Sequence, residues 1–227
     1  PDNPMTFFFL WSLYLLIRYW EKPLARFLVA GGAFFAAGFL YLQKAILLFP
    51  VLGSVLVFFI FKKKFSLRGL LLYGISFAIP VAVFLSGYLL EGRIEEYLLY
   101  NWIVNAHKQG AEYYWHYFLH TLLLNPSFLL LLLLALIHWV RHFRTMDARL
   151  KIIIVTGLAL GILAALTPRP WKQYFLPVWP LLAVGFASTA ERYLRRLPGY
   201  AKVFFAALLL LLSLPVYRAD VLVLSNV

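Results

Sequence analysis

Long apolar blocks alternate with short polar stretches along most of the 227 residues. The blocks recur at about 15 to 24 residues, the length that a helix needs to cross roughly 30 Å of hydrocarbon. One of them, Leu129–Leu134, is an unbroken leucine run. The pattern predicts eight helical segments that cross a membrane: 6–20, 27–42, 45–61, 69–90, 117–140, 152–167, 174–189 and 203–217.

The composition supports the membrane interpretation of this pattern. Hydrophobic residues make up 63% of the chain and charged residues 13%, whereas soluble domains carry roughly 25% charged residues. A water-soluble fold of this size could not bury so much apolar surface. We therefore expect an all-α, polytopic transmembrane helix bundle, with residues 1–217 as one unit and 218–227 as a short extracytoplasmic tail.

The basic residues are distributed unequally between the two sides of this bundle. Four alternate connections, 18–26, 62–68, 141–151 and 191–202, hold fifteen of the 21 basic residues and three acidic ones. The remaining stretches hold six of each. Because cytoplasmic loops are enriched in Lys and Arg, these four connections are predicted to face the cytoplasm. Membrane orientation thus explains the net charge of +12, and nucleic acid is excluded as a partner.

Two local patterns predict how parts of the bundle are built. Small residues gather in segment 27–42, where they let helices approach closely: Ala30, Gly31, Gly32, Ala33, Ala36, Ala37 and Gly38. In the outer connection 91–112, apolar residues recur at four-residue spacing, at Ile94, Leu98 and Trp102. This spacing predicts an amphipathic helix in the outer membrane interface.

Familiar enzyme motifs are absent from the sequence. There is no HExxH, Walker loop, GxSxG or dinucleotide glycine fingerprint, and the lack of cysteine excludes thiol chemistry. His116, His120 and His138 are too scattered to form a metal site. What remains is a set of polar residues on the predicted outer side: Asp2, Lys44, Glu95, Glu96, His107, Lys108, Arg169, Lys172 and Tyr174.

Each outer cation has two interpretations. Lys44 either snorkels from a tight turn or contacts a ligand, and Arg169 and Lys172 are either ordinary loop charges or functional ones. The last two run against the positive-inside bias in a six-residue loop, which favours a function. Three cations around one cavity suit a phosphate or pyrophosphate. His107 is either an interfacial polar residue or a metal ligand.

Four landmarks occur in a fixed order within residues 1–180. They are Pro1–Phe9 with its Asp2, the Ala37–Lys44 stretch, Tyr113-Tyr114-Trp115 followed by Asn125-Pro126, and the Pro170–Pro180 stretch with Lys172, Tyr174, Pro177 and Pro180. In this order they resemble motifs of type C fold glycosyltransferases, the polytopic family that includes bacterial aminoarabinose transferases and protein mannosyltransferases. Gln43, Ala45 and Ser127 depart from the family's Thr, Gly and Trp.

The resemblance implies an enzyme of the bacterial inner membrane. Such an enzyme moves a sugar from a polyprenyl-phosphate donor to a lipid, glycan or protein acceptor at the extracytoplasmic face. It further implies that Asp2 is an accessory carboxylate, that Lys44, Arg169 and Lys172 hold the donor phosphate beside Tyr174, and that His107 or Glu96 belongs to an acceptor or metal site. No metal ligand is assigned, and a divalent ion stays open as a cofactor.

The family's principal catalytic carboxylate precedes the first landmark. We therefore expect the chain to be a fragment that lacks the N-terminal catalytic loop and is inactive alone. The rival hypothesis is a transporter or flippase segment for a lipid-linked or anionic solute. Transporters place ionisable groups near mid-membrane, and the apolar segments here have almost none.

Overall fold

The computed structural model describes residues 3–41, 48–103, 126–166, 177–204, 206–208 and 211. Within these ranges every regular element is a helix, which confirms the all-α prediction for the part described. The elements are α1 (Asn3–Glu21), α2 (Ala25–Tyr41), α3 (Leu48–Phe61), α4 (Leu67–Leu90), α5 (Ile94–Leu98), a π-helical turn η2 (Leu99–Ile103), α8 (Pro126–His142), a 3-10 turn η3 (Phe143–Thr145), α9 (Ala148–Leu166) and α10 (Val178–Leu194). The proposed tail 218–227 lies outside the described residues.

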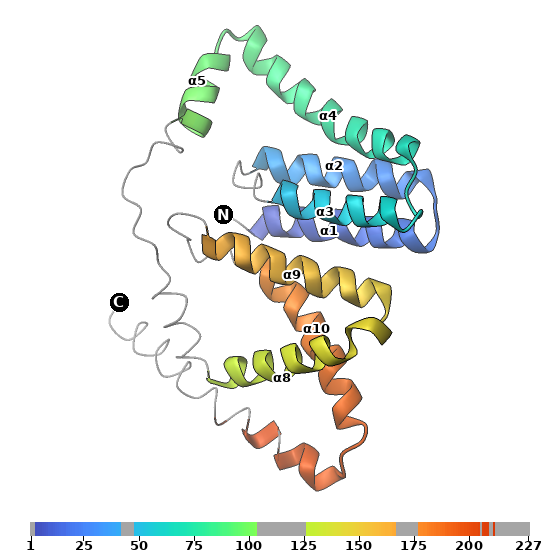
Figure 1. Cartoon of the computed structure of the whole chain (residues 1–227). Helices are drawn as coiled ribbons and strands as arrows, with labels where there is room; N and C mark the ends of the chain where they lie inside the picture. The colour runs from blue at the N-terminus through green and yellow to red at the C-terminus, as the bar shows by residue number, and fades with distance from the viewer. Residues whose placement is uncertain are drawn as a thin grey trace, which may run out of the picture.

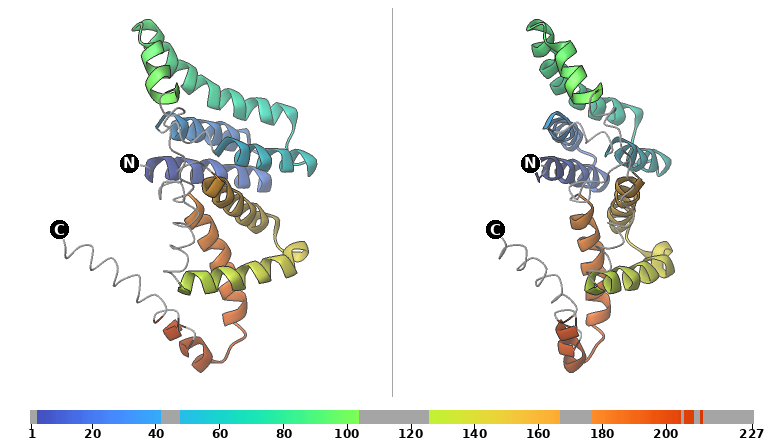
Figure 2. Two further views of the ribbon diagram at one scale, coloured as in Figure 1. Left: turned by 60° about the vertical axis from the view of Figure 1, so that its left-hand side comes forward. Right: turned by 90° about the vertical axis from the view of Figure 1, so that its left-hand side faces the viewer.

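The N-terminal helices pack closely on one another. α1 packs on α2 and on α3, and α4 packs on α2. The Phe49 ring of α3 also contacts Phe35 of α2 and Phe77 of α4. α9 packs on α3. α10 then packs on α9, and α8 packs on α10. Figures 1 and 2 show this succession, with α4 and α5 at one end and α8 with the lower part of α10 at the other.

The core lies where α1 meets its neighbours. Phe9 and Leu16 of α1 are fully buried, and Leu52 and Phe59 of α3 join the same apolar cluster. Trp20 of α1 stacks on the Phe58 ring of α3 at 5.8 Å. α1 is therefore the central helix of the N-terminal half.

Small residues set the close approach of α2 to its neighbours, as the sequence predicts. A Cβ added at Gly32 would lie 2.4 Å from the Tyr73 carbonyl oxygen of α4, and one at Gly31 would lie 3.3 Å from the Tyr73 ring. A Cβ at Gly38 would lie 3.3 Å from Phe8 of α1. Two faces of α2 therefore need glycine for packing, one toward α4 and one toward α1.

Among the described residues, two helices are long and apolar enough to cross a membrane, namely α4 with 24 residues and α9 with 19 residues. Only 11% of the α4 span is buried within the protein, against 39% of the α9 span. The exposed side of α4 is a continuous apolar stripe at four-residue spacing: Leu67, Leu71, Ile75, Ile79 and Val83. This stripe has no protein cover within the described residues.

The helix ends differ from the predicted segment ends by a few residues. α9 begins at Ala148 rather than 152, and α10 continues to Leu194 rather than 189. Charged residues occupy these extensions, and Glu191 pairs with Arg195 one turn later. The difference arises because apolar runs report burial in hydrocarbon, whereas a helix continues as long as its backbone hydrogen bonds do.

The outer connection is helical but not one continuous helix. α5 covers five residues, and the π turn η2 follows it directly. Tyr97 is buried and packs on the rings of Phe84 and Tyr88 at the end of α4. The predicted amphipathic helix is thus present only as a short segment folded against α4, and its continuation beyond residue 103 lies outside the described residues.

Candidate functional site

The six residues that the sequence assigns to the site lie outside the described residues: Asp2, Lys44, His107, Arg169, Lys172 and Tyr174. Asp2 directly precedes α1, Lys44 falls between α2 and α3, and residues 167–176 fall between α9 and α10. Their grouping stays a prediction. The helix ends that flank them are described and can be compared.

The flanking helix ends lie on one side of the assembly. In Figure 1 the N-terminal ends of α1, α3 and α8 and the C-terminal ends of α2 and α9 all lie on the left-hand side. α10 begins close to the end of α9 on that side. α1, α3 and α8 therefore run in one direction and α2 and α9 in the other, whereas α10 crosses them obliquely.

The opposite side carries three of the basic connections, 18–26, 62–68 and 141–151, and a group of ion pairs. Arg149 contacts Glu21 at 2.7 Å and Asp147 at 3.0 Å, and Arg18 contacts Glu21 at 2.9 Å. The hydrogen bond from Arg149 holds the pKa of Asp147 below its ordinary value. Because Glu21 ends α1 and Arg149 begins α9, these pairs join the two halves of the chain at this face.

On the outer connection, Glu96 already has a basic partner. The Arg93 Nε atom lies 3.2 Å from a Glu96 carboxylate oxygen, and Glu91 lies 3.8 Å from the same guanidinium. The hydrogen bond with Glu96 raises the pKa of Arg93. Glu96 is the carboxylate that the resemblance offers beside His107. Within the described ranges no three His, Asp or Glu residues gather as a metal site.

Few polar side chains are buried among the described residues: Thr6, Ser12, His138, Thr156 and Thr189. His138 of α8 lies 3.0 Å from the Tyr193 hydroxyl of α10, and its ring stacks on His142 at 4.4 Å. This arrangement accounts for His138 as a packing contact between two helices. The buried interior described here holds no carboxylate, lysine or arginine.

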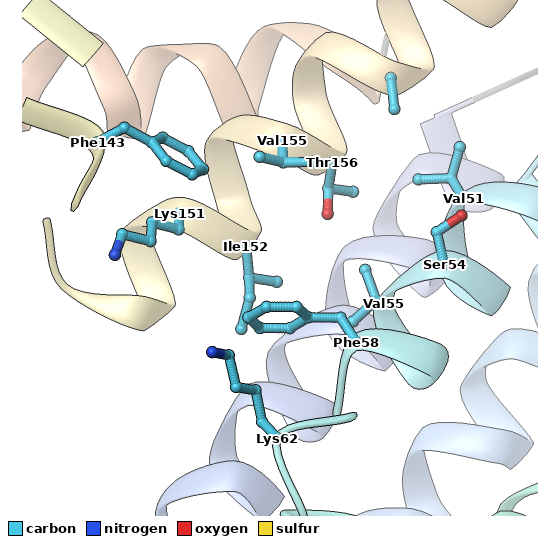
Figure 3. A pocket seen from close by; sticks show the side chains of 11 residues that line it. Val51, Ser54, Val55, Phe58, Lys62, Phe143, Lys151, Ile152, Val155 and Thr156 are labelled. Carbon is cyan, nitrogen blue, oxygen red and sulfur yellow. The ribbon is translucent and has the colours of Figure 1, made fainter. Parts of the chain in front are cut away.

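A cavity of about 370 Å³ lies between α3 and α9. Its walls are apolar and come from Val51, Val55 and Phe58 on α3 and from Ile152, Val155 and Ala159 on α9. Lys62 and Lys151 also line it, and Figure 3 shows both ammonium groups toward the same end. The Lys151 ammonium lies over the Phe143 ring at 5.4 Å and the Lys62 ammonium over the Phe58 ring at 5.8 Å. The end of the cavity that carries the two lysines therefore lies by the basic connections 62–68 and 141–151, away from the helix ends that flank the predicted site.

Nothing in the sequence singles out this cavity. Lys62 and Lys151 lie about ninety residues apart in the chain, and in the sequence they are two of the charges that predict the orientation. The only available signal was that each lysine adjoins an apolar segment on the same side. Which segments become neighbours is a property of the fold.

The comparisons with known proteins add no relative to this description. No protein-family model, no curated protein and no solved structure matches the chain. The resemblance to type C fold glycosyltransferases therefore rests on the four sequence landmarks, and the function is argued from these landmarks and from the arrangement of the helices.

Proposed function

We propose that the chain is a membrane-embedded helical bundle of about eight spans. The exposed stripe on α4 supports this placement, since Leu71, Ile79 and Val83 are each more than half exposed. In water such a contiguous apolar surface would drive aggregation, whereas lipid covers it without cost. The asymmetric distribution of basic connections supports an orientation with the ion-paired face toward the cytoplasm.

Within this placement, we propose that the protein transfers a sugar from a polyprenyl-phosphate donor to a lipid, glycan or protein acceptor at the extracytoplasmic face of the bacterial inner membrane. The observation that carries the proposal is the common side of the described helix ends next to Asp2, Lys44 and the 168–173 turn. Residues that follow directly on these ends start from one face of the bundle. The four landmarks, whose order resembles that of type C fold glycosyltransferases, favour sugar transfer as the reaction at this face.

The proposed roles follow from what the reaction needs. A carboxylate within hydrogen-bond reach activates the acceptor hydroxyl, and cations stabilise the departing phosphate. Asp2 would orient the acceptor or the base, and Lys44, Arg169 and Lys172 would neutralise the phosphate with Tyr174 beside them. The acceptor oxygen bonds to the anomeric carbon as the bond from that carbon to the lipid phosphate breaks, and the hydroxyl proton passes to the carboxylate. The substitution inverts the anomeric carbon, because the new bond forms on the face opposite the leaving phosphate. His107 would contact the acceptor.

The test uses Lys44→Gln and Arg169→Gln in the protein as its own gene encodes it, with Arg196→Gln on the basic face as the matched control. Arg196 lies in an exposed turn after α10. Transfer of labelled sugar from a polyprenyl-phosphate donor is measured in proteoliposomes. We expect each outer variant to lose about 10²- to 10³-fold in rate, as when one transition-state contact is removed, and the control to keep its rate.

The same variants separate the enzyme from a transporter. Unchanged sugar transfer, together with altered uptake of an anionic solute in the Lys44→Gln and Arg169→Gln proteins, would contradict glycosyl transfer. That result would favour the transporter hypothesis. Expression and detergent extraction equal to the parent protein are required of each variant before its rate is compared.

A further inference from the structure

We propose that the cavity between α3 and α9 binds an anionic glycerophospholipid from the leaflet on the basic side. One acyl chain would lie between the apolar walls. The phosphate would lie between Lys62 and Lys151, at the end of the cavity that carries the two lysines (Figure 3). The proposal rests on the membrane placement above. It concerns the face opposite the proposed donor site and does not require glycosyl transfer.

The two lysines give one end of the cavity a positive charge. Neither Lys62 nor Lys151 forms an ion pair with a carboxylate in the described part of the chain. Glu21 and Asp147 are already bound to Arg18 and Arg149 at 2.7–3.0 Å. These acidic side chains therefore do not occupy the two lysines at the cavity. Basic pockets between membrane helices on the cytoplasmic side bind anionic head groups.

Local hydrogen bonds hold the backbone at Lys62 and the ammonium group of Lys151 in place. α3 ends in a Schellman motif, in which the Lys63 N–H donates to the Ile60 carbonyl at 2.8 Å and the Lys64 N–H donates to the Phe59 carbonyl at 3.0 Å. This motif holds Lys62 at the helix end. The Lys151 ammonium donates to the Arg144 carbonyl at 3.1 Å. An ammonium has three donors, so donors remain for a phosphate.

The buried hydroxyl of Thr156 favours a glycerophospholipid over a polyprenyl phosphate. Thr156 is 1% exposed, and its hydroxyl has no hydrogen-bond partner among the described residues. Figure 3 shows the hydroxyl directed into the space between α9 and α3. Five residues separate it from Lys151, which places it about 7.5 Å deeper along the helix. A glycerophospholipid has ester carbonyls below its phosphate that can accept this hydrogen bond, whereas a polyprenyl phosphate has none.

The size of the cavity agrees with partial burial of one chain. Its volume of about 370 Å³ is at the lower end of the roughly 300–1,000 Å³ that is common for ligand sites. Ala159 lines the cavity on α9, eight positions after Lys151. A larger side chain at this position would fill the inner part of the cavity without touching the lysines.

The experiment measures which lipids stay bound to the purified 227-residue chain. The protein is equilibrated in detergent with equimolar phosphatidylglycerol and phosphatidylcholine, and the retained lipid is quantified by native mass spectrometry. We expect the parent chain to retain phosphatidylglycerol preferentially. In the Lys62→Gln/Lys151→Gln variant this preference should fall about 25-fold, because each lysine near the surface contributes roughly a fivefold factor.

Matched variants separate this site from general basic attraction. Lys22→Gln, in the turn between α1 and α2, removes a charge from the same face outside the cavity and should keep the preference. Ala159→Phe should reduce retention of both lipids because it occupies the chain site. Thr156→Val should lower the retention of phosphatidylglycerol severalfold. In competition with polyprenyl phosphate, it should reduce the ratio of retained phosphatidylglycerol to retained polyprenyl phosphate.

Three results would overturn the proposal. These are equal retention of the two phospholipids by the parent chain, an unchanged preference in the double lysine variant, and a preference for polyprenyl phosphate that Thr156→Val leaves unaltered. Failure of the proposed enzyme function alone would leave lipid retention intact. A chain that stays in the aqueous phase without detergent would instead contradict the membrane placement on which both proposals depend.

Discussion

At the residue scale, two buried hydrogen bonds join helices that are distant in sequence. The Ser12 and Tyr73 hydroxyls, 2.8 Å apart, join α1 to α4. The Trp139 indole N–H donates to the Thr189 hydroxyl at 2.9 Å and joins α8 to α10. In apolar surroundings such groups are costly without a partner, so each pair fixes one register of its two helices.

Removing the two partners of the first bond should have unequal effects. Ser12→Ala leaves the buried Tyr73 hydroxyl without its partner and should lower the free energy of unfolding by about 1–2 kcal/mol. Tyr73→Phe should cost less, about 0.5–1 kcal/mol, because the Ser12 hydroxyl can donate to a carbonyl of its own helix. Unfolding in mixed detergent–SDS micelles measures both values. A larger loss for Tyr73→Phe than for Ser12→Ala would contradict this assignment.

A second prediction concerns the turn after α3. Lys63 has a φ of 54°, the one positive value outside glycine among the described residues. A side chain in this conformation is strained, and glycine is the common residue at this position of a Schellman motif. Lys63→Gly should therefore stabilise the protein by up to about 1 kcal/mol. The control Lys22→Gly, in a turn with ordinary φ, should be neutral or destabilising, as thermal unfolding in detergent can show.

At the element scale, the tight contacts of α2 depend on glycine, and the effect of adding one methyl group should depend on position. Gly32→Ala places its Cβ 2.4 Å from the Tyr73 carbonyl oxygen, so α2 and α4 must separate. We expect a loss of about 1–3 kcal/mol. Gly74→Ala in α4 meets nothing within 4 Å and should be neutral or slightly stabilising. Equal unfolding midpoints for the two variants would show that α2 and α4 are not in this contact.

Elements could be predicted where their signal is local. Each apolar run within the described ranges forms a helix, and the glycines of 27–42 pack as their spacing indicates. The outer connection was less predictable, because its four-residue spacing does not reveal the π turn at Leu99–Ile103. Just before this turn, in α5, Tyr97 is buried and packs on Tyr88. This tertiary contact outweighs the local periodicity.

The candidate sites show the same difference. The outer group around Asp2 and Lys44 could be proposed from loop alternation and resemblance, both of which are readable in the chain, and it stays a prediction. The cavity between α3 and α9 could not be proposed, because Lys62 and Lys151 meet only through the packing of two helices. Its unpartnered Thr156 hydroxyl is likewise invisible in a sequence.

At the scale of the whole molecule, the chain has two chemically different faces. The Glu21–Arg149 pair at 2.7 Å joins α1 to α9 on the face that carries the basic connections. The helix ends next to the predicted outer site lie on the other side of the assembly (Figures 1 and 2). Both proposals use this polarity, with sugar transfer on one face and lipid binding on the other.

This polarity can be measured directly because the chain contains no cysteine, so any introduced thiol is unique. We expect Gln43→Cys and Gln173→Cys to react with a membrane-impermeant maleimide in intact cells. Lys64→Cys and Gly199→Cys should react only after the membrane is opened, and the cysteine-free parent should take no label. Labelling of Gln43→Cys and Gln173→Cys from opposite compartments would separate Lys44 from Arg169 and Lys172 by the bilayer, so these cations could not neutralise one phosphate. Labelling of Lys64→Cys from outside would reverse the orientation and place the lipid site in the other leaflet.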